Sequence, residues 1–249
     1  MQTFLTTGSL FRGKRRVVLL SFLLMINGLL LIVTMRGVQN LHLPETVVMQ
    51  HYNEINNPLH NAAASRKPPT PGIGPVVGKA SAAVTVVEFT DYECSQCAEY
   101  FEGAFQAIRK RYVDTGLVKF EIRNFPLSSV HRQAEAAAVA VLCAAKQQAF
   151  EGMHDLLYSN QSEWTAADDP SVFFRSYATN CGISVAQFNA CLSSSEIRSA
   201  LATDITDAQD AGINGTPTFW IYAPDGTVRQ INGAYPLETF QTAFDAILE

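Results

Sequence analysis

Four stretches of the chain carry hydrophobic residues in runs typical of β-strands. The first, 83–89, is mostly apolar and β-branched, as expected of a buried central strand. Shorter runs follow at 117–123, 218–222 and 227–231, and Asp225-Gly226 between the last two is a turn signal of β-hairpins. These runs predict a central mixed sheet.

The positions between and after these strands have the spacing of helices. Aromatic and aliphatic residues recur at helical intervals from Cys94 to Tyr112, which predicts a helix directly after the first strand. The segment at about 130–212 is predicted to be entirely helical, and it contains an alanine-rich run that strongly favours a helix. A last helix is expected from Leu237 to Leu248. The sequence therefore predicts an α/β domain interrupted by an all-helical insertion.

A different pattern occupies the N-terminal segment, where Val17 to Met35 comprises 19 residues without a charged side chain. As a helix this stretch would span roughly 28 Å, close to the thickness of the hydrocarbon core of a membrane. The alternatives are a buried core helix and a cleaved signal peptide, but a signal peptide usually has a shorter apolar region and a small-residue cleavage pattern. We therefore expect an uncleaved transmembrane anchor at 17–35.

The charges on either side of this stretch predict its orientation. Four basic residues precede it and one follows it: Arg12, Lys14, Arg15 and Arg16, then Arg36. Because basic residues are retained on the cytoplasmic side, residues 1–16 are expected in the cytoplasm and the rest outside it, in the periplasm or an equivalent space. The protein is thus expected to be a single-pass protein of the cell membrane, with its folded domain in a compartment that permits disulfides.

Residues 36–76 are polar and contain six prolines, a composition typical of a linker or stalk, so the folded domain is expected at 77–249. The chain has a net charge of −5, although its first 36 residues carry five basic and no acidic side chains. The remainder is therefore acidic, with a net charge of −10. It lacks the basic composition of nucleic-acid-binding proteins, so this class of partner is excluded.

The residues with the clearest chemistry are Cys94-Ser95-Gln96-Cys97, which lie where the first predicted strand gives way to a helix. Unpaired N–H groups and the helix dipole stabilise a thiolate at such a position, so Cys94 is expected to be the more acidic, exposed sulfur. Cys97 follows on the same helix face, where it can attack a mixed disulfide formed at Cys94. The motif therefore predicts a redox-active dithiol.

Other uses of paired cysteines are a zinc site, a structural disulfide and haem attachment. Haem attachment requires a histidine directly after the motif, where this chain has Ala98. Zinc sites built on this spacing have a second pair of cysteines with the same spacing, whereas the other cysteines of this chain are isolated. His131 and His154 are expected on helix surfaces, without the neighbours of a metal site. We therefore expect no metal and no cofactor.

A second motif, Gly215-Thr216-Pro217-Thr218-Phe219, opens the third predicted strand. Pro217 cannot donate a hydrogen bond to a neighbouring strand, and only the bond before a proline adopts the cis form at a small cost. Both the cis and the trans form fit the sequence.

In this order the motifs resemble those of the DsbA-like branch of the thioredoxin-fold oxidoreductases, over about 170 residues from Gly78 to the C-terminus. Three stretches carry the likeness and two others fit it: Val86–Cys97, Asn124–Leu127 and Gly215–Phe219, then Cys143–Ala145 and Phe150–Leu157. The resemblance implies a thioredoxin fold with a helical insertion. It also implies a protein thiol-disulfide oxidoreductase that needs no cofactor, acts on exported proteins with thiols or disulfides, and is reset by a membrane redox partner.

The resemblance also implies roles for individual residues. The Thr216-Pro217 bond is expected to be cis and to lie beside the dithiol, where the backbone binds an extended segment of substrate by strand addition. Glu88, desolvated on the buried strand, is expected to exchange a proton with Cys97. These implied roles complete the site around Cys94.

A second disulfide, from Cys143 to Cys191, is implied by similarity to relatives with such a bridge, and it leaves Cys181 unpaired. Bridges from Cys143 to Cys181 and from Cys181 to Cys191 remain open from the sequence. The sequence is also compatible with no second disulfide at all.

The two residues between the active cysteines depart from the strongly oxidising members of the family, which have Pro-His there. Ser95-Gln96 carries no charge and is flanked by Glu93 and Glu99, so the pKa of Cys94 is expected above that of such members and the disulfide less oxidising. We expect an oxidase. A disulfide isomerase or reductase, and a non-catalytic chaperone or assembly module on the same scaffold, are the alternatives.

Overall fold

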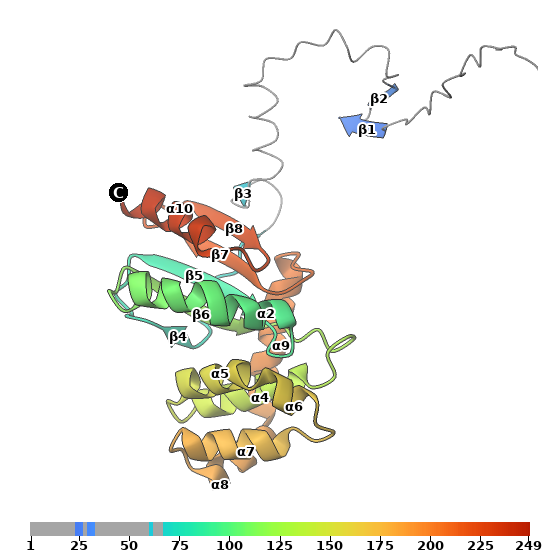
Figure 1. Cartoon of the computed structure of the whole chain (residues 1–249), viewed down its shortest axis with the longest axis vertical. Coiled ribbons are helices and arrows are strands. Elements are labelled where there is room, and N and C mark those ends of the chain that lie inside the picture. The colour runs from blue at the N-terminus through green and yellow to red at the C-terminus, as the bar shows by residue number, and fades with distance from the viewer. Residues whose placement is uncertain (1–22, 27–28, 33–59, 62–66) are drawn as a thin grey trace, which may run out of the picture. The chain divides into compact units, whose positions relative to one another are not determined.

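The computed structural model of the chain describes residues 23–26, 29–32, 60–61 and 67–249. It divides into two units, 1–56 and 57–249. The second unit contains the predicted α/β domain, whose elements are labelled in Figure 1.

A six-stranded sheet forms the centre of the second unit, in the strand order β3-β8-β7-β5-β6-β4. Its strands are β3 (His60–Asn61), β4 (Val76–Val77), β5 (Val84–Thr90), β6 (Val118–Asn124), β7 (Thr218–Tyr222) and β8 (Val228–Asn232). β5 and β6 are parallel, and every other neighbouring pair is antiparallel. The predicted mixed sheet is confirmed, and its four main strands lie within one residue of their expected bounds.

The described residues form eleven helical segments, and these confirm the predicted order of helices. The helix after β5 alternates between α-helical and π-helical turns: α2 (Ser95–Tyr100), η3 (Phe101–Phe105), α3 (Gln106–Ile108) and η4 (Arg109–Val113). The insertion consists of α4 (Ala134–Ala145), α5 (Phe150–Ser159), α6 (Gln161–Thr165), α7 (Ser171–Asn180), α8 (Val185–Leu192) and α9 (Ser195–Asp210). The last helix is α10 (Leu237–Leu248), with the bounds that the sequence predicts.

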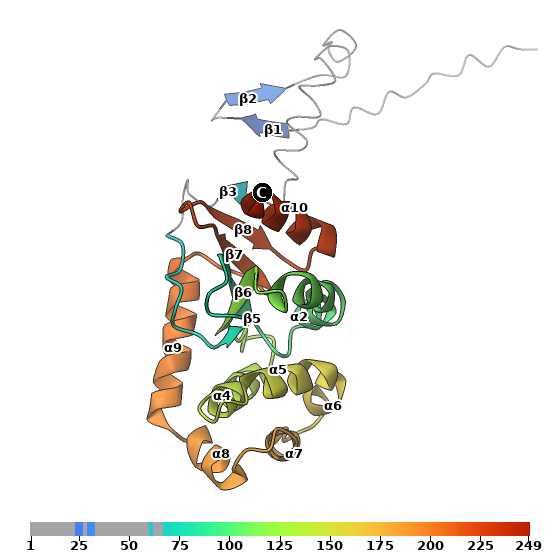
Figure 2. The same ribbon diagram turned by 90° about the vertical axis from the view of Figure 1, so that its left-hand side faces the viewer.

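Helices cover both faces of the sheet. The helix that begins with α2 and the C-terminal α10 pack on one face, and α9 lies on the other (Figure 2). The alternation of β5 explains this division, because Val84 and Val86 point into the first core and Val87 and Phe89 into the second. β5 is therefore buried on both sides, as expected from its mostly apolar sequence.

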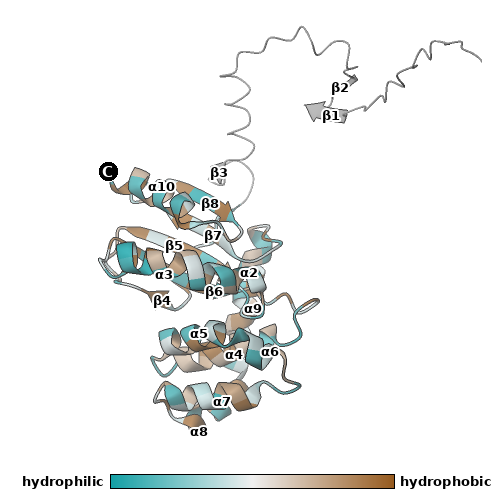
Figure 3. Cartoon of the chain, in the orientation of Figure 1, coloured by the Kyte–Doolittle hydropathy of each residue, from teal (hydrophilic) through white to brown (hydrophobic). Residues whose placement is uncertain are grey.

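The helical insertion is organised around α4, which contacts α5, α7, α8 and α9. Most of its residues are alanine, valine or leucine, and it is drawn mainly in the hydrophobic colours of Figure 3. Cys143 on α4 forms a disulfide with Cys191 on α8, which is the pairing that the family resemblance implied. Cys181, directly after α7, is a free thiol.

The folded unit begins earlier in the chain than the sequence indicates. The Tyr222 hydroxyl donates a hydrogen bond to the carbonyl oxygen of Pro69, and the N–H groups of 72–74 donate to the Glu121 carboxylate. β4 pairs with β6, and β3 pairs with β8. Residues 67–76, assigned to the linker from their prolines, thus belong to the folded unit, because their N–H groups bind a carboxylate that is distant in sequence.

The described residues of the N-terminal segment differ from the expected helix. Within the stretch 17–35, β1 (Leu23–Ile26) and β2 (Leu29–Ile32) pair as antiparallel strands. The dipeptide between them, Asn27-Gly28, is a strong hairpin signal and favours strand pairing over a continuous helix. No helix in the part of the chain that the structure describes is long and apolar enough to cross a membrane. The rest of the predicted anchor, and most of the linker, lie outside the described residues.

Candidate active site

Cys94 and Cys97 lie at the junction of β5 and α2, as the sequence predicts. Cys94 is the N-cap residue of α2, and its carbonyl accepts the N–H of Ala98 at 3.2 Å. Cys94 is 8% exposed and Cys97 is 1% exposed. Cys94 is thus the more exposed sulfur, but it is much less open to solvent than expected, because Thr216 and Gln161 lie against it.

The surroundings of Cys94 favour its thiolate. The pKa of Cys94 falls from 9.0 to about 5, chiefly through a hydrogen bond with the Cys97 thiol. Burial raises the pKa of Cys94 in part. Hydrogen bonds with the Thr216 side chain and with the backbone N–H groups of Cys97 and Gln96 lower it further. Because the thiolate is the nucleophile, Cys94 is ready to react at neutral pH.

The surroundings of Cys97 favour its protonated thiol instead. Burial, the hydrogen bond with Cys94 and the negative charge of Cys94 raise the pKa of Cys97 well above its usual range. The reduced protein therefore holds one ionised and one protonated sulfur within a single helical turn.

Glu88 lies on β5, on the face that carries Val84 and Val86, and is 3% exposed. Burial raises the pKa of Glu88 from 4.5 to about 8, and a hydrogen bond with Thr90 offsets part of this rise. Thr90 follows on the same face and also contributes a hydrogen bond to Cys97. Thr90 thus affects the pKa of both the Glu88 carboxyl group and the Cys97 thiol. Sequence reasoning missed this link, although the two-residue period of the strand was a signal for it.

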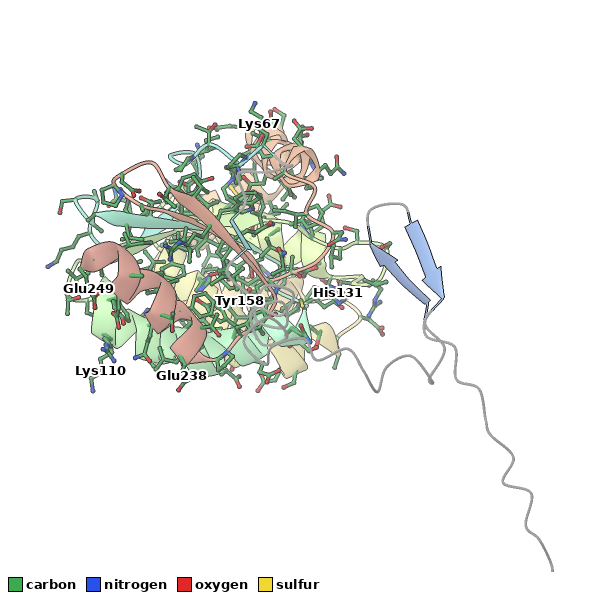
Figure 4. The ribbon with its side chains drawn as sticks, turned by 90° about the horizontal axis from the view of Figure 1, so that it is seen from above. Lys67, Lys110, His131, Tyr158, Glu238 and Glu249 are labelled. Atoms are coloured by element: carbon green, nitrogen blue, oxygen red, sulfur yellow. A yellow bond between two sulfur atoms is a disulfide. The ribbon has the colours of Figure 1, made fainter. Side chains whose placement is uncertain are left out.

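Tyr158 on α5 completes the buried side of the site. Its hydroxyl oxygen is 2.6 Å from the hydroxyl oxygen of Thr90. Figure 4 shows Tyr158 within the body of the domain. Burial raises the pKa of Tyr158 well above its usual range, so its hydroxyl stays protonated at neutral pH.

The loop before β7 lies against Cys94. The Thr216-Pro217 peptide is cis, as the family resemblance implied, and the Cys94 Sγ is 3.5 Å from the carbonyl oxygen of Thr216. The Thr218 hydroxyl donates to the carbonyl of Gly215 at 2.9 Å, and the N–H of Gly233 donates to the carbonyl of Pro217 at 2.8 Å. These bonds hold the main chain of Thr216 beside the reactive sulfur.

The two histidines are not placed on helix surfaces as expected. His154 on α5 is buried among aromatic rings, and its Nδ1 is 2.8 Å from the Tyr92 hydroxyl. Burial lowers the pKa of His154 to about 3, so it is neutral. Its four-residue spacing from Phe150 and Tyr158 was the signal that it faces the core. His131 lies in the loop before α4, with its Nδ1 2.8 Å from the Asp91 carboxylate.

Two open clefts flank the start of the helix that carries the dithiol. One has a volume of about 530 Å³ and is lined by Ser95, Glu99, Tyr158 and Gln161 among others. The other, of about 250 Å³, is lined by Glu99 and by Tyr235 after β8, among others. Neither cleft is lined by Cys94 or Cys97 themselves. Among the residues that the structure describes, no group of three or more His, Cys, Asp or Glu side chains is placed to hold a metal ion.

A family model described as Thioredoxin matches residues 71–246 of the chain. A Na⁺/H⁺ antiporter NhaA 3 of Salinispora tropica is 34% identical over 168 residues, which are 68% of this chain and 24% of the antiporter. A protein of Rickettsia conorii whose assigned name is protein-disulfide oxidoreductase is 26% identical over 175 residues, which are 70% of this chain and 60% of that protein. The chain thus spans about a quarter of the first relative and three fifths of the second.

The fold of this chain is also similar to that of solved structures. Oxidised BdbD from Bacillus subtilis matches with a TM-score of 0.64 and 25% identity, over 74% of this chain and 98% of BdbD. Wolbachia pipientis alpha-DsbA1 matches with a TM-score of 0.63 and 23% identity, over 72% of this chain and 92% of alpha-DsbA1, and shows the same fold.

Proposed function

Because the chain belongs to the thioredoxin family, as a DsbA-like member with a helical insertion, we propose that it exchanges disulfides with other proteins through Cys94 and Cys97. The observation that carries this proposal is the difference in acidity between the two sulfurs. Cys94 has a pKa of about 5, whereas the pKa of Cys97 lies well above its usual range. The pair therefore contains one thiolate that can enter and leave a disulfide, and one protonated thiol in reserve.

The exchange requires no group beyond the thiols of the two proteins. A substrate thiolate attacks Sγ of Cys94 in the oxidised pair, the bond to Cys97 breaks, and Cys97 leaves as a thiolate that takes up a proton. A second substrate thiolate attacks the substrate sulfur of the mixed disulfide, and Cys94 leaves as a thiolate. Two electrons pass from the substrate dithiol to the Cys94-Cys97 pair, and the substrate gains one disulfide.

Two neighbours of the pair support these steps. Glu88, with its raised pKa and its connection through Thr90, donates the proton that Cys97 takes up and accepts it in the reverse step. The main chain of Thr216, beside Cys94, pairs with an extended substrate segment, and Pro217 has no N–H to donate. Substrates are then selected by an accessible cysteine in an extended segment rather than by one side chain.

The proposed direction is oxidation of substrates. A low pKa makes Cys94 a good leaving group and stabilises the reduced pair, which makes the disulfide more oxidising. A pKa of about 5 lies between those of thioredoxin, roughly 7, and DsbA, roughly 3.5. We expect a reduction potential between their values of about −270 and −120 mV. A membrane redox partner would then reoxidise the pair.

The test uses the purified full chain, oxidised, with a reduced test protein as substrate. Formation of disulfides in the test protein is expected, and Cys94→Ser should abolish it. Cys97→Ser should instead accumulate a mixed disulfide at Cys94, visible by mass spectrometry. Cys181→Ser is the matched control and should retain full activity, because Cys181 lies away from the site. A wild-type chain that neither oxidises the test protein nor exchanges with glutathione would refute the proposal.

An isomerase or reductase is the second candidate, favoured by the uncharged Ser95-Gln96 pair between the cysteines. A reduction potential near that of thioredoxin, together with a mainly reduced Cys94-Cys97 pair in cells, would establish it in place of the oxidase. A non-catalytic chaperone role would be supported if Cys94→Ser kept the full cellular function.

We further propose that the domain works outside the cytoplasm and is attached to the membrane by the uncharged segment 17–35. The support is the length of this segment and the excess of basic residues before it. The described strands β1 and β2 differ from a spanning helix, so membrane attachment is tested directly. Intact cells producing the chain should protect residues 1–16 from added protease but expose the domain, and a chain lacking 1–35 should leave the membrane fraction.

A further inference from the structure

The turn that carries the dithiol is bonded to the loop between β6 and α4. Asp91 is buried, and its carboxylate accepts the N–H of Glu93 and the N–H of Leu127, each at 2.8 Å. The same carboxylate binds Nδ1 of His131 at 2.8 Å. The N–H of Cys94 donates to the carbonyl of Asp91 at 3.1 Å. The imidazole of His131 is therefore anchored to the turn that positions Cys94.

This arrangement favours a protonated imidazole. Partial burial opposes it, but the hydrogen bond to Asp91 and the negative charges of Asp91, Cys94 and Glu93 together raise the pKa of His131. The side chain is 24% exposed, and Figure 4 shows His131 towards the margin of the domain. Nδ1 is occupied by Asp91, whereas Nε2 has no hydrogen-bond partner among the described residues.

The charges around His131 come from two places. The turn after β5 contributes the three negative groups, and Glu93 also accepts the N–H of Gln133 in the loop of His131. The loop itself contributes Arg132, which lies 3.9 Å from Asp168 and is exposed. The CxxC motif contributes no cation, because Ser95 and Gln96 are neutral. On the insertion side of the dithiol turn, His131 is thus a residue whose pKa is raised towards its positively charged form.

We propose that His131, oriented by Asp91, is a positioning residue whose positive charge stabilises the Cys94 thiolate and so makes the Cys94-Cys97 disulfide more oxidising. The inference rests on the proposed exchange function and adds a residue outside the CxxC motif to it. When Cys94 leaves a mixed disulfide as a thiolate, His131 keeps its proton and stabilises the negative charge. No atom is transferred to or from the imidazole.

We expect His131 to lower the pKa of Cys94 less than the groups in contact with Cys94 do. The Cys97 thiol, the Thr216 side chain and the N–H groups of α2 are the main causes of the low pKa of Cys94. A single, partly exposed charge changes an ionisation equilibrium by about 3- to 10-fold. This effect should fade as the imidazole loses its proton.

The test measures two properties of the full chain in its folded form: the pH dependence of Cys94 alkylation by iodoacetamide, and the equilibrium constant with glutathione. His131→Gln should shift the alkylation profile of Cys94 to higher pH and make the oxidising equilibrium constant about 3- to 10-fold smaller. At 29.6 mV per tenfold change, this is a fall in reduction potential of about 15 to 30 mV. His131→Lys should restore much of both properties, because it restores the charge.

Arg132→Gln is the matched control, since it removes the neighbouring cation that faces Asp168, and it should leave both properties unchanged. The proposal is overturned if folded His131→Gln keeps the wild-type alkylation profile, or if His131→Lys behaves like His131→Gln. Alkylation needs no exchange activity. A chain that fails to exchange disulfides but shows the His131 effect would therefore refute only the proposed function.

Discussion

Replacement of Glu88 by glutamine should stabilise the protein, and the gain should depend on pH. Glu88 is buried on β5, and its pKa rises from 4.5 to about 8 because burial disfavours the carboxylate. In the unfolded chain the carboxyl group ionises at its ordinary pKa, so unfolding releases a proton between these two pH values. Wild-type stability is therefore unaffected below about pH 4.5, falls as the pH rises towards 8, and is level above it.

The size of the effect follows from this difference. Each pH unit between the two pKa values lowers the free energy of unfolding by about 1.4 kcal/mol. The loss is thus roughly 3 kcal/mol at pH 7 and about 5 kcal/mol above pH 8. Glu88→Gln removes the ionisable group and should recover most of this loss.

The assay is urea denaturation of the reduced full chain at several pH values, for the wild type and for Glu88→Gln. The stability difference should be small at pH 4.5 and grow steadily up to about pH 8. Glu102→Gln, an exposed substitution on the same helix as the dithiol, is the control and should show no such growth. A difference between wild type and Glu88→Gln that is constant across this pH range would show that burial does not raise the pKa of Glu88. The substitution should also slow exchange by removing the proton donor of Cys97.

Three further predictions concern the scaffold of the site. Replacing Cys143 and Cys191 by alanine should lower the free energy of unfolding by about 4 kcal/mol, as the chain-entropy model gives for a separation of 48 residues, measured by denaturation under oxidising conditions. Gly74→Ala should destabilise the domain by about 1–3 kcal/mol, because the new Cβ would lie 2.5 Å from a main-chain oxygen of β6; unchanged stability would place 67–76 outside the folded unit. Asp204→Ala should cost about 3 kcal/mol, because it leaves the guanidinium of Arg123, which is 0% exposed, without its closest partner; a loss below 1 kcal/mol would contradict this role for the ion pair.

The local pattern of the sequence accounts for most of the fold. The four main strands, the helix after β5, the helical character of the insertion and α10 follow from apolar runs, helical spacing and helix propensity, which depend only on neighbouring residues. The position of Cys94 at the start of a helix follows in the same way, and with it the direction of its pKa shift. The cis peptide at Pro217 and the Cys143-Cys191 bridge came instead from the likeness to a known family, since spacing left both open.

Other features depend on contacts between distant residues. Strands β3 and β4 are two residues each, too short for a periodic signal, and they form only because β8 and β6 offer edges with free hydrogen-bonding groups. The segment 17–35 is a different case. Its apolar composition fits both a helix and a hairpin, whereas Asn27-Gly28 favours the hairpin, in which β1 pairs with β2.

What the sequence determined by itself is the order of the elements, the dithiol and its place at a helix N-terminus. What only the tertiary structure decided is which side chains surround that dithiol: Thr90 between Glu88 and Cys97, and His131 on the carboxylate of Asp91. These contacts join residues up to 40 positions apart, and the contact with Asp91 raises the pKa of His131 against the effect of burial. Periodicity records which face of an element is apolar, but it carries no information on which polar groups meet when several elements pack together.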